Sequence, residues 1–136
     1  MLRIVIWSWL LVSFGCSRSS IGPDEAKANL ETGISLVAET EMFLTFVAEG
    51  KSVPNFTQGH IAYLEQEVES LQKQLDDSPP EPSVSEMVHE CRAQLVVLHQ
   101  ELLRFPASVK NKNELVASRA RISAVRKKLE DIYSAR

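Results

Sequence analysis

The sequence has few of the residues that build small secreted scaffolds or cofactor sites. Two of its 136 residues are cysteine and five are glycine. Two cysteines can form one disulfide at most, so packing rather than a disulfide framework must hold the fold. The glycines form neither a phosphate-binding loop nor a nucleophile elbow. These absences argue against disulfide-rich domains, nucleotide-binding folds and hydrolases of the nucleophile-elbow type.

Metal-binding spacings are also missing. Glu86 and His89 match the Glu-x-x-His element of di-iron bundles, but such sites need a second copy and two further carboxylates. His89 and Glu90 begin like a zinc-protease helix, yet the second histidine would fall at Ala93. No Cys-x-x-Cys-His sequence is present, which excludes a c-type haem bundle. We therefore expect no catalytic, cofactor-binding or metal-binding residues, and no enzymatic activity.

The chain does contain an apolar segment at its N-terminus. Arg3 is the only charged residue before Cys16, and residues 4–14 are apolar except for two serines. A short positive region, an apolar region and a small residue form the layout of a secretory signal. The segment from Ile4 to Gly15 would extend only about 18 Å as a helix, whereas a bilayer core needs about 30 Å. The sequence therefore predicts a cleaved export signal rather than a permanent membrane span.

The last five residues of this region, Val12 to Cys16, read VSFGC and resemble the lipobox of bacterial lipoproteins. In that family a small residue, here Gly15, precedes a cysteine that is lipidated on its sulfur and becomes the mature N-terminus. The resemblance implies that Cys16 carries fatty-acyl chains such as palmitate and anchors the protein in the cell envelope. Ser17, in place of aspartate, implies the outer membrane, facing the periplasm, if the source is Gram-negative. The alternative is ordinary cleavage near Gly15, which leaves Cys16 a free thiol.

These features divide the chain into three parts. Residues 1–15 are the predicted signal peptide, residues 16–22 the lipidated cysteine with a short polar tether, and residues 23–136 one helical domain. Aromatic residues make up only 7% of the sequence. Glu, Leu, Val, Ala and Ser are plentiful, which is typical of helical proteins. We therefore expect an all-α domain.

Four segments of this domain repeat apolar residues at steps of three and four, the spacing of amphipathic helices. The first segment starts at Pro23 and stops at Gly50. Pro106 is predicted to close the third helix. Capping boxes predict the starts of the second, third and fourth helices, at Asn55 with Gln58, Ser83 with Glu86, and Asn111 with Glu114.

The same spacing predicts which residues are buried. In the first helix, Gly33 and Thr40 place small residues on the apolar seam, which indicates close helix packing, with a binding notch as the alternative. Four further residues widen that seam: Leu36, Met42, Phe43 and Phe46. The predicted seams, in chain order, are Ala26, Leu30, Gly33, Val37, Thr40, Leu44, Val47; Ile61, Leu64, Val68, Leu71, Leu75; Val84, Val88, Cys91, Leu95, Leu98, Leu102, Phe105; and Leu115, Ser118, Ile122, Val125, Leu129, Ile132.

Four helices joined by short connections fit an up-down-up-down four-helix bundle. Residues 76–82 include three prolines and predict an extended connection between the two helical halves. Narrow heptad seams in three helices leave a second architecture open, in which two long helical hairpins complete a core by dimerising. Cys91 lies on a seam, which indicates a buried thiol; a disulfide-linked homodimer is the alternative.

Charge is distributed unevenly along the chain. Acidic residues outnumber basic ones from Cys16 to Arg104, and basic residues outnumber acidic ones from there to the C-terminus. A basic segment on an acidic body can pair internally, contact anionic lipid or bind a partner, and internal pairing is the default. It lacks interleaved aromatics, so we expect no nucleic-acid partner. Because the fourth helix of such a bundle returns toward the anchor, its basic residues are predicted at the membrane-proximal end: Arg126, Lys127, Lys128 and Arg136. Asp76, Asp77 and Glu81 are predicted at the same end and offset that charge, so a solvated helix end without a lipid contact is the favoured alternative.

Two functions fit this sequence. The first is a membrane-anchored envelope lipoprotein, a non-enzymatic helical scaffold or protein-interaction module that binds an envelope protein. The second is a periplasmic bundle that binds a small apolar ligand or acts in envelope stress. A concave apolar pocket with a few convergent polar groups would favour the ligand. A solid core with an exposed apolar patch would favour the interaction module.

Overall fold

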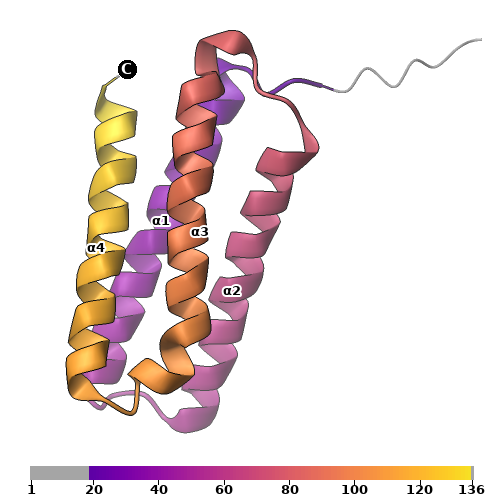
Figure 1. Ribbon diagram of the computed structural model, residues 1–136. Coiled ribbons are helices and arrows are strands. Elements are labelled where there is room, and N and C mark those ends of the chain that lie inside the picture. The colour runs from indigo at the N-terminus through magenta and orange to yellow at the C-terminus, as the bar shows by residue number, and fades with distance from the viewer. Residues whose placement is uncertain (1–18, 136) are drawn as a thin grey trace, which may run out of the picture.

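The computed structural model describes residues 19–135, which form four antiparallel helices joined by short connections (Figure 1). The elements are α1 (Pro23–Ala48), α2 (Pro54–Asp77), the 3-10 turn η1 (Pro82–Val84), α3 (Ser85–Ser108) and α4 (Lys112–Ser134). The predicted signal peptide, the lipidation site Cys16 and Arg136 lie outside the described residues. Among the helices that are described, none has the length and apolar character needed to cross a membrane.

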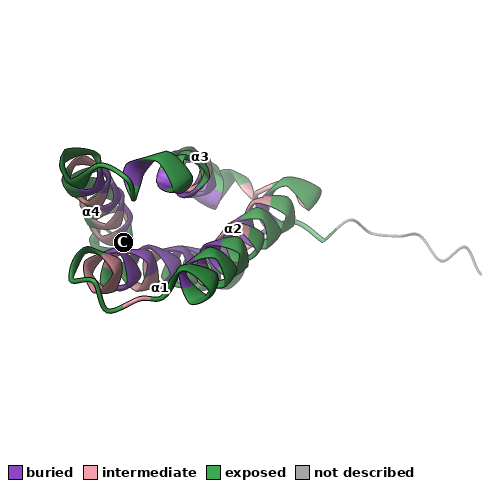
Figure 2. Cartoon of the chain, turned by 90° about the horizontal axis from the view of Figure 1, so that it is seen from below, coloured by how far each residue is buried: buried purple, intermediate pink, exposed green. Residues whose placement is uncertain are grey.

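The helices form an up-down-up-down bundle, which confirms the predicted fold class. α1 packs against all three other helices, whereas α2 and α4 occupy opposite corners (Figure 2). The longest helix, α1, has 26 residues and is therefore about 39 Å long. The apolar seams of all four helices join in one core within a single chain. A second copy is therefore not needed to complete that core.

Burial confirms most of the predicted seams. Every seam residue predicted for α2 and α3 is buried, and in α4 only Ile132 remains partly exposed. In α1 the seam is buried as far as Leu44. The prediction for Met42 is wrong, because this side chain is 69% exposed. Met42 follows the exposed Ser35 and Ala38 at steps of three and four, so it lies on the outer face of α1.

Gly33 lies where three other helices approach α1. A Cβ atom at this position would lie 3.6 Å from Leu129 Cδ1 and 3.8 Å from a Cδ2 atom of both Leu71 and Leu95. Thr40, the other small residue of the seam, is buried and donates its hydroxyl to the Leu36 carbonyl at 2.7 Å. The leucines already occupy the space in front of Gly33. No binding notch is therefore present at Gly33, although a single methyl group would meet these leucines only at ordinary contact distance.

Both predicted ends of α1 and the predicted start of α4 are confirmed. α1 begins at Pro23, and Gly50 follows its end with a φ of 70°, a conformation that glycine adopts without steric cost. Asn111 is the N-cap of α4, since its Oδ1 accepts hydrogen bonds from the N–H groups of Asn113 and Glu114.

Three other predicted boundaries are wrong. α2 begins at Pro54 without a side-chain cap from Asn55, because proline suits the first helical position, where its missing N–H is not needed. α3 begins at Ser85, since the 3-10 turn η1 precedes it and displaces Ser83 from the N-cap position. Pro106 does not close α3, which continues to Ser108. A proline removes one hydrogen bond and bends a helix, and the last turn survives that loss here.

The chain enters the bundle at Ile21, beside the connection between α2 and α3. The Ile21 N–H donates to the Pro79 carbonyl at 2.8 Å, and the Glu81 N–H donates to the Ile21 carbonyl at 2.9 Å. The Ile21 side chain is fully buried, although the sequence placed it in the tether. We call this the proximal end of the bundle, and the last turn of α4 also lies there (Figure 1). The distal end holds the α1–α2 and α3–α4 connections.

Candidate functional site

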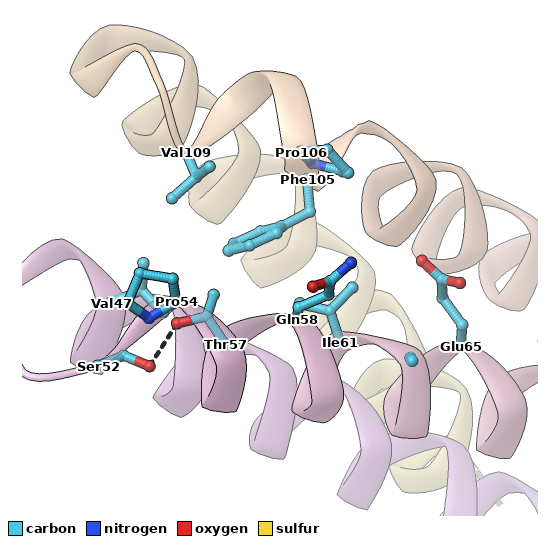
Figure 3. Close-up of a pocket in the computed structure, with 11 residues that line it drawn as sticks. Val47, Ser52, Pro54, Thr57, Gln58, Ile61, Glu65, Phe105, Pro106 and Val109 are labelled. Carbon is cyan, nitrogen blue, oxygen red and sulfur yellow. Dashed lines mark hydrogen bonds between the residues drawn. The ribbon is translucent and has the colours of Figure 1, made fainter.

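An apolar groove of about 640 Å³ opens at the distal end, between the first half of α2 and the last turns of α3 (Figure 3). Its floor consists of buried or half-buried residues, namely Val47, Thr57, Ile61 and Phe105. Its rim consists of exposed residues, namely Pro54, Gln58 and Ala62 on α2 and Pro106 and Val109 at the end of α3. Five of the lining residues are thus exposed, so the groove is open to solvent along its length.

The groove forms because α3 turns away from α2 near its end. The last turn of α3 bends toward α4 (Figures 1 and 2), as expected for a helix that contains Pro106 two residues before its end. On the α2 wall, the exposed Ala62 is too small to fill the space that this bend leaves. A proline on one helix and a small residue on the other therefore keep the groove open.

Most polar groups at the groove are paired locally. Ser52 Oγ hydrogen-bonds Thr57 Oγ1, which in turn donates to the Val53 carbonyl at 3.0 Å. Glu65 is different: it is half-buried, and within residues 19–135 it makes neither a hydrogen bond nor an ion pair. Glu65 is also the groove's only charged lining residue. The groove therefore combines an apolar floor with one carboxylate that has no partner in the described chain.

A group of aromatic rings lies on the other side of α2, toward α1. The His60 ring lies 4.4 Å from Phe43 and is stacked on Phe56 at 5.7 Å, measured between ring centroids. Phe56 is 53% exposed and Tyr63 is 45% exposed. Exposed aromatic rings of this kind are common in protein interfaces. The distal half of α2 is thus bordered by apolar surface on both flanks.

A buried carboxylate ties the distal part of α3 to α4. Glu101 is 2% exposed, and its two oxygens accept hydrogen bonds from Arg121 at 2.7 and 3.0 Å and from Ser118 at 2.9 Å. Arg104 adds a third cationic contact at 3.2 Å. Burial raises the pKa of the Glu101 carboxyl, but the Arg121 and Ser118 hydrogen bonds and the two arginine charges outweigh burial, so the pKa falls below its ordinary value. The Glu101 carboxylate is thus held ionised, both of its oxygens accept hydrogen bonds, and it links α3 to α4.

The sequence did not single out Glu101, because its partners lie on another helix. Ser118 was predicted as a polar member of the α4 seam, and it faces the Glu101 carboxylate. In the sequence, the only signals of this contact are Ser118 on the α4 seam and Arg121 three residues later. They become informative only once α3 and α4 are known to be neighbours.

Cys91 is buried as its seam position predicted, and two histidines lie between helices. His60 Nε2 of α2 is 3.4 Å from Glu39 of α1, and His99 Nε2 of α3 is 3.3 Å from Glu69 of α2. Both rings therefore flank the core, each between two neighbouring helices. In the part of the chain that is described, no three His, Cys, Asp or Glu side chains are grouped as a metal site would require. Cys91 is buried, and desolvation raises the pKa of its thiol to about 11. Such a thiol is protonated at neutral pH and therefore unreactive.

The basic residues of α4 divide between internal pairing, which was the default expectation, and exposure toward the proximal end. Arg126 contacts Glu41, from the distal half of α1, and Glu130 at 3.3 Å. Arg126 therefore lies about midway along the bundle axis, where it forms ion pairs within the chain, rather than at the proximal end. Lys127 and Lys128 remain exposed on the half of α4 that leads to that end.

Comparisons with protein-family models, with curated proteins and with solved structures gave no match to this chain. No relative therefore assigns a role to any residue. The groove, the charge around it and its position relative to the entry of the chain are the features from which a function can be inferred.

Proposed function

We propose that this protein is a lipid-anchored lipoprotein of the cell envelope whose helical bundle is a non-enzymatic module for binding another envelope protein. The observation that carries the proposal is the position of the groove. It lies at the distal end, whereas the chain enters the bundle at Ile21 on the proximal end. A lipid anchor at Cys16 would therefore leave the groove facing away from the membrane.

The geometry of the entry point supports this arrangement. Four residues separate Cys16 from Ile21, and the five residue steps between them span at most about 18 Å. Ile21 is held by two backbone hydrogen bonds and a buried side chain, so movement of the body relative to the anchor is limited to that short segment. Along α2, the groove then begins about 18 Å from the proximal end, at Glu65, and reaches about 35 Å from it, at Pro54.

A protein partner suits the groove better than a small ligand does. Small-molecule sites enclose most of the ligand surface, whereas this groove is lined by five exposed residues. An exposed apolar side chain also lies next to its rim, at Leu103 of α3, which is three residues before Pro106 and 58% exposed. Contiguous apolar surface of this kind marks protein interaction sites.

The small apolar ligand remains the second candidate, since a volume of about 640 Å³ falls within the range of ligand pockets. The measurement that separates the two functions is titration of the full chain with an apolar fluorescent probe. Saturable binding that the groove-filling variant Ala62→Trp abolishes, in a chain that captures no protein, would favour the ligand.

The anchor is tested by the Cys16→Ser variant. We expect the wild-type chain in the membrane fraction, with a mature N-terminus at an acylated Cys16. The variant should be released from membranes or remain unprocessed, because it lacks the acylated sulfur. Mass spectrometry that finds Cys16 unmodified, or an N-terminus elsewhere, would contradict the anchor.

The binding function is tested by co-purification after crosslinking in intact cells. A specific partner should accompany the wild-type chain and the Ala38→Trp variant, whose substitution lies on the exposed face of α1. It should be lost from Ala62→Trp, which fills the groove. If the same proteins accompany all three chains, the groove is not the binding surface.

A further inference from the structure

We infer that the groove binds an amphipathic helix of the partner, whose apolar face fills the groove and whose lysine or arginine pairs with Glu65. This inference rests on the proposed function and gives the chemistry of its partner. Three features of the groove support it: its length, its charge and the helical structure around it.

The groove has the length of a short helical contact. It follows α2 from Pro54 to Glu65, which corresponds to about 16 Å of helix. A helix with apolar residues at i, i+3 or i+4, and i+7 presents about 10 Å of apolar stripe, which fits within that length. Above the groove, the contact between His99 and Glu69 at 3.3 Å closes the space between α2 and α3. The groove therefore has a defined inner end, close to Glu65.

The surrounding structure selects a helix over other peptide conformations. An extended peptide binds by adding a strand to a sheet edge, and residues 19–135 contain no sheet. A polyproline segment docks between aromatic ridges, and Phe105 is the only aromatic residue that lines the groove. The remaining mode is an amphipathic helix laid between two helices, where it extends the packing that the bundle already uses.

Glu65 sets the charge of the occupant. A carboxylate that is partly withdrawn from water gains from a charged hydrogen-bond donor, and Glu65 has no such donor within the described residues. No lysine or arginine occurs between Lys51 and Lys73. Lys51 and Lys110 lie in the distal loops, and Lys51 is paired with Glu49 at 2.6 Å. The cation of the bound helix is therefore expected at the inner end of the groove.

The row of exposed apolar residues on α3 widens this surface. Val96 and Leu103 are separated by two helical turns, so they lie on one face of α3. Leu103 is three residues from Pro106 at the rim, whereas Val96 lies beyond the His99 contact that ends the groove. An occupant that covers both the groove and this row needs apolar side chains along more than one turn. A helix of two to three turns meets that requirement, whereas a single inserted side chain does not.

The test uses the full-length chain, in whichever cell fraction contains it, with a photo-crosslinking residue at position 62. That residue is a diazirine amino acid of leucine size, because a larger side chain there would fill the groove as Ala62→Trp does. The probe is a synthetic helical peptide of about five turns, with leucines at helical spacing bordered by lysines. Its matched control carries glutamate in place of every lysine. A second chain with the photo-crosslinker at position 38, on the exposed face of α1, reports non-specific adsorption.

We expect the lysine peptide to crosslink at position 62 and not at position 38, and the glutamate peptide to crosslink at neither. Glu65→Gln should lower the yield at position 62 about fivefold. Glu67→Gln removes the same charge from an exposed residue that does not line the groove, and it should leave the yield unchanged.

Three results would overturn the inference: equal yields at positions 62 and 38, equal yields for the two peptides, or equal effects of Glu65→Gln and Glu67→Gln. A crosslink from position 62 to a second copy of the chain, made without peptide, would also overturn it and would assign the groove to self-association. None of these outcomes depends on membrane attachment. Failure of the lipid anchor and failure of the groove chemistry are therefore distinguishable.

Discussion

The two ends of the α2–α3 hairpin differ in how they are closed. At the proximal end Arg92 donates to the Leu75 carbonyl and lies 3.1 Å from Asp76, so α3 is tied to the end of α2. Ile21 adds two backbone hydrogen bonds to the connection that follows. At the distal end, among the residues described, no hydrogen bond or ion pair joins the first half of α2 to the end of α3. One end is sealed by polar contacts and the other is an open apolar groove.

This difference shows that heptad spacing alone does not decide whether a helix pair closes. The seams of α2 and α3 continue through both ends with the same steps of three and four. What changes is the partner of the polar residues that flank the seam. At the distal end Glu101 of α3 binds Arg121 and Ser118 of α4, so α3 is held toward α4 and away from α2. The groove is therefore a consequence of how polar contacts are divided among helices.

The largest loss of stability is expected from a charged residue in the middle of the core. Such a change would unfold the whole bundle, including both ends of the α2–α3 hairpin. Leu95 is fully buried and lies beside Gly33. Leu95→Asp should destabilise the fold by more than about 3 kcal/mol, because an aspartate there is buried without a partner. Circular dichroism should show loss of helix. Val96→Asp, on the 47% exposed neighbour, is the control and should cost about 0.5 kcal/mol or less. Equal unfolding midpoints for the two variants would contradict the core assignment.

The second prediction weakens only the sealed end. Ile21→Ala removes a fully buried side chain and should cost about 2–4 kcal/mol in urea unfolding. The backbone amides of Ile21 and Glu81 should also exchange hydrogen faster, because their two hydrogen bonds depend on that packing. Leu103→Ala, at the 58% exposed position near the groove, should change stability by about 0.5 kcal/mol or less. If both variants behave alike, Ile21 does not hold the proximal end.

The third prediction concerns the contact that holds α3 toward α4. Glu101→Gln should lower the free energy of unfolding by about 1–3 kcal/mol at neutral pH. The cost stays below that of a fully buried pair, because the Arg121 side chain is 41% exposed and regains water. Glu90→Gln, on the exposed face of the same helix, is the control and should be nearly neutral. An equal effect of the two variants would show that the Glu101 contact adds no stability.

The effect of Glu101 also has a defined pH dependence. Its pKa is lower in the folded chain than the ordinary value of about 4.3 that applies when unfolded. The stabilisation is therefore fully present above that ordinary value and is lost as the pH falls through the folded pKa. Urea unfolding of the wild type and of Glu101→Gln should differ at pH 7, and the difference should shrink once the pH falls below the ordinary value. A difference that does not shrink as the pH is lowered would mean that the charge is not what stabilises the contact.

The helices and their seams were predictable because they depend on local spacing. Each helix must bury one face, and residues such as Leu64, Val68 and Leu71 report that face within two turns. Asn111 was predictable for the same reason, since a cap acts on the residues that follow it directly. Pro106 was predicted as a helix end, because the rule for proline does not state whether one more turn can form after it.

The candidate site was not predictable, because its walls are far apart in the sequence. Ile61 and Phe105 were assigned to the core, but the opening between them depends on the bend of α3 toward α4. Pro106 accounts for a bend but not for its direction, and the Glu101–Arg121 contact that ties α3 to α4 joins two different helices. Ile21 likewise reads as part of a polar tether until the connection near Pro79 is placed beside it.

The smallest effect is expected at Gly33, where the other three helices approach α1. Gly33 lies in the interior of α1, where glycine costs up to about 1 kcal/mol relative to alanine. A Cβ there would meet leucine atoms at 3.6–3.8 Å, which are ordinary contacts, so Gly33→Ala should raise the free energy of unfolding by about 0.5–1 kcal/mol. Gly50→Ala is the matched control: its φ of 70° disfavours alanine, so the same substitution should destabilise the fold by about 1 kcal/mol. Urea unfolding of both variants decides the point. If Gly33→Ala lowers stability instead, the leucines around α1 are packed too tightly to admit a methyl group, and this glycine is required for the approach of the helices.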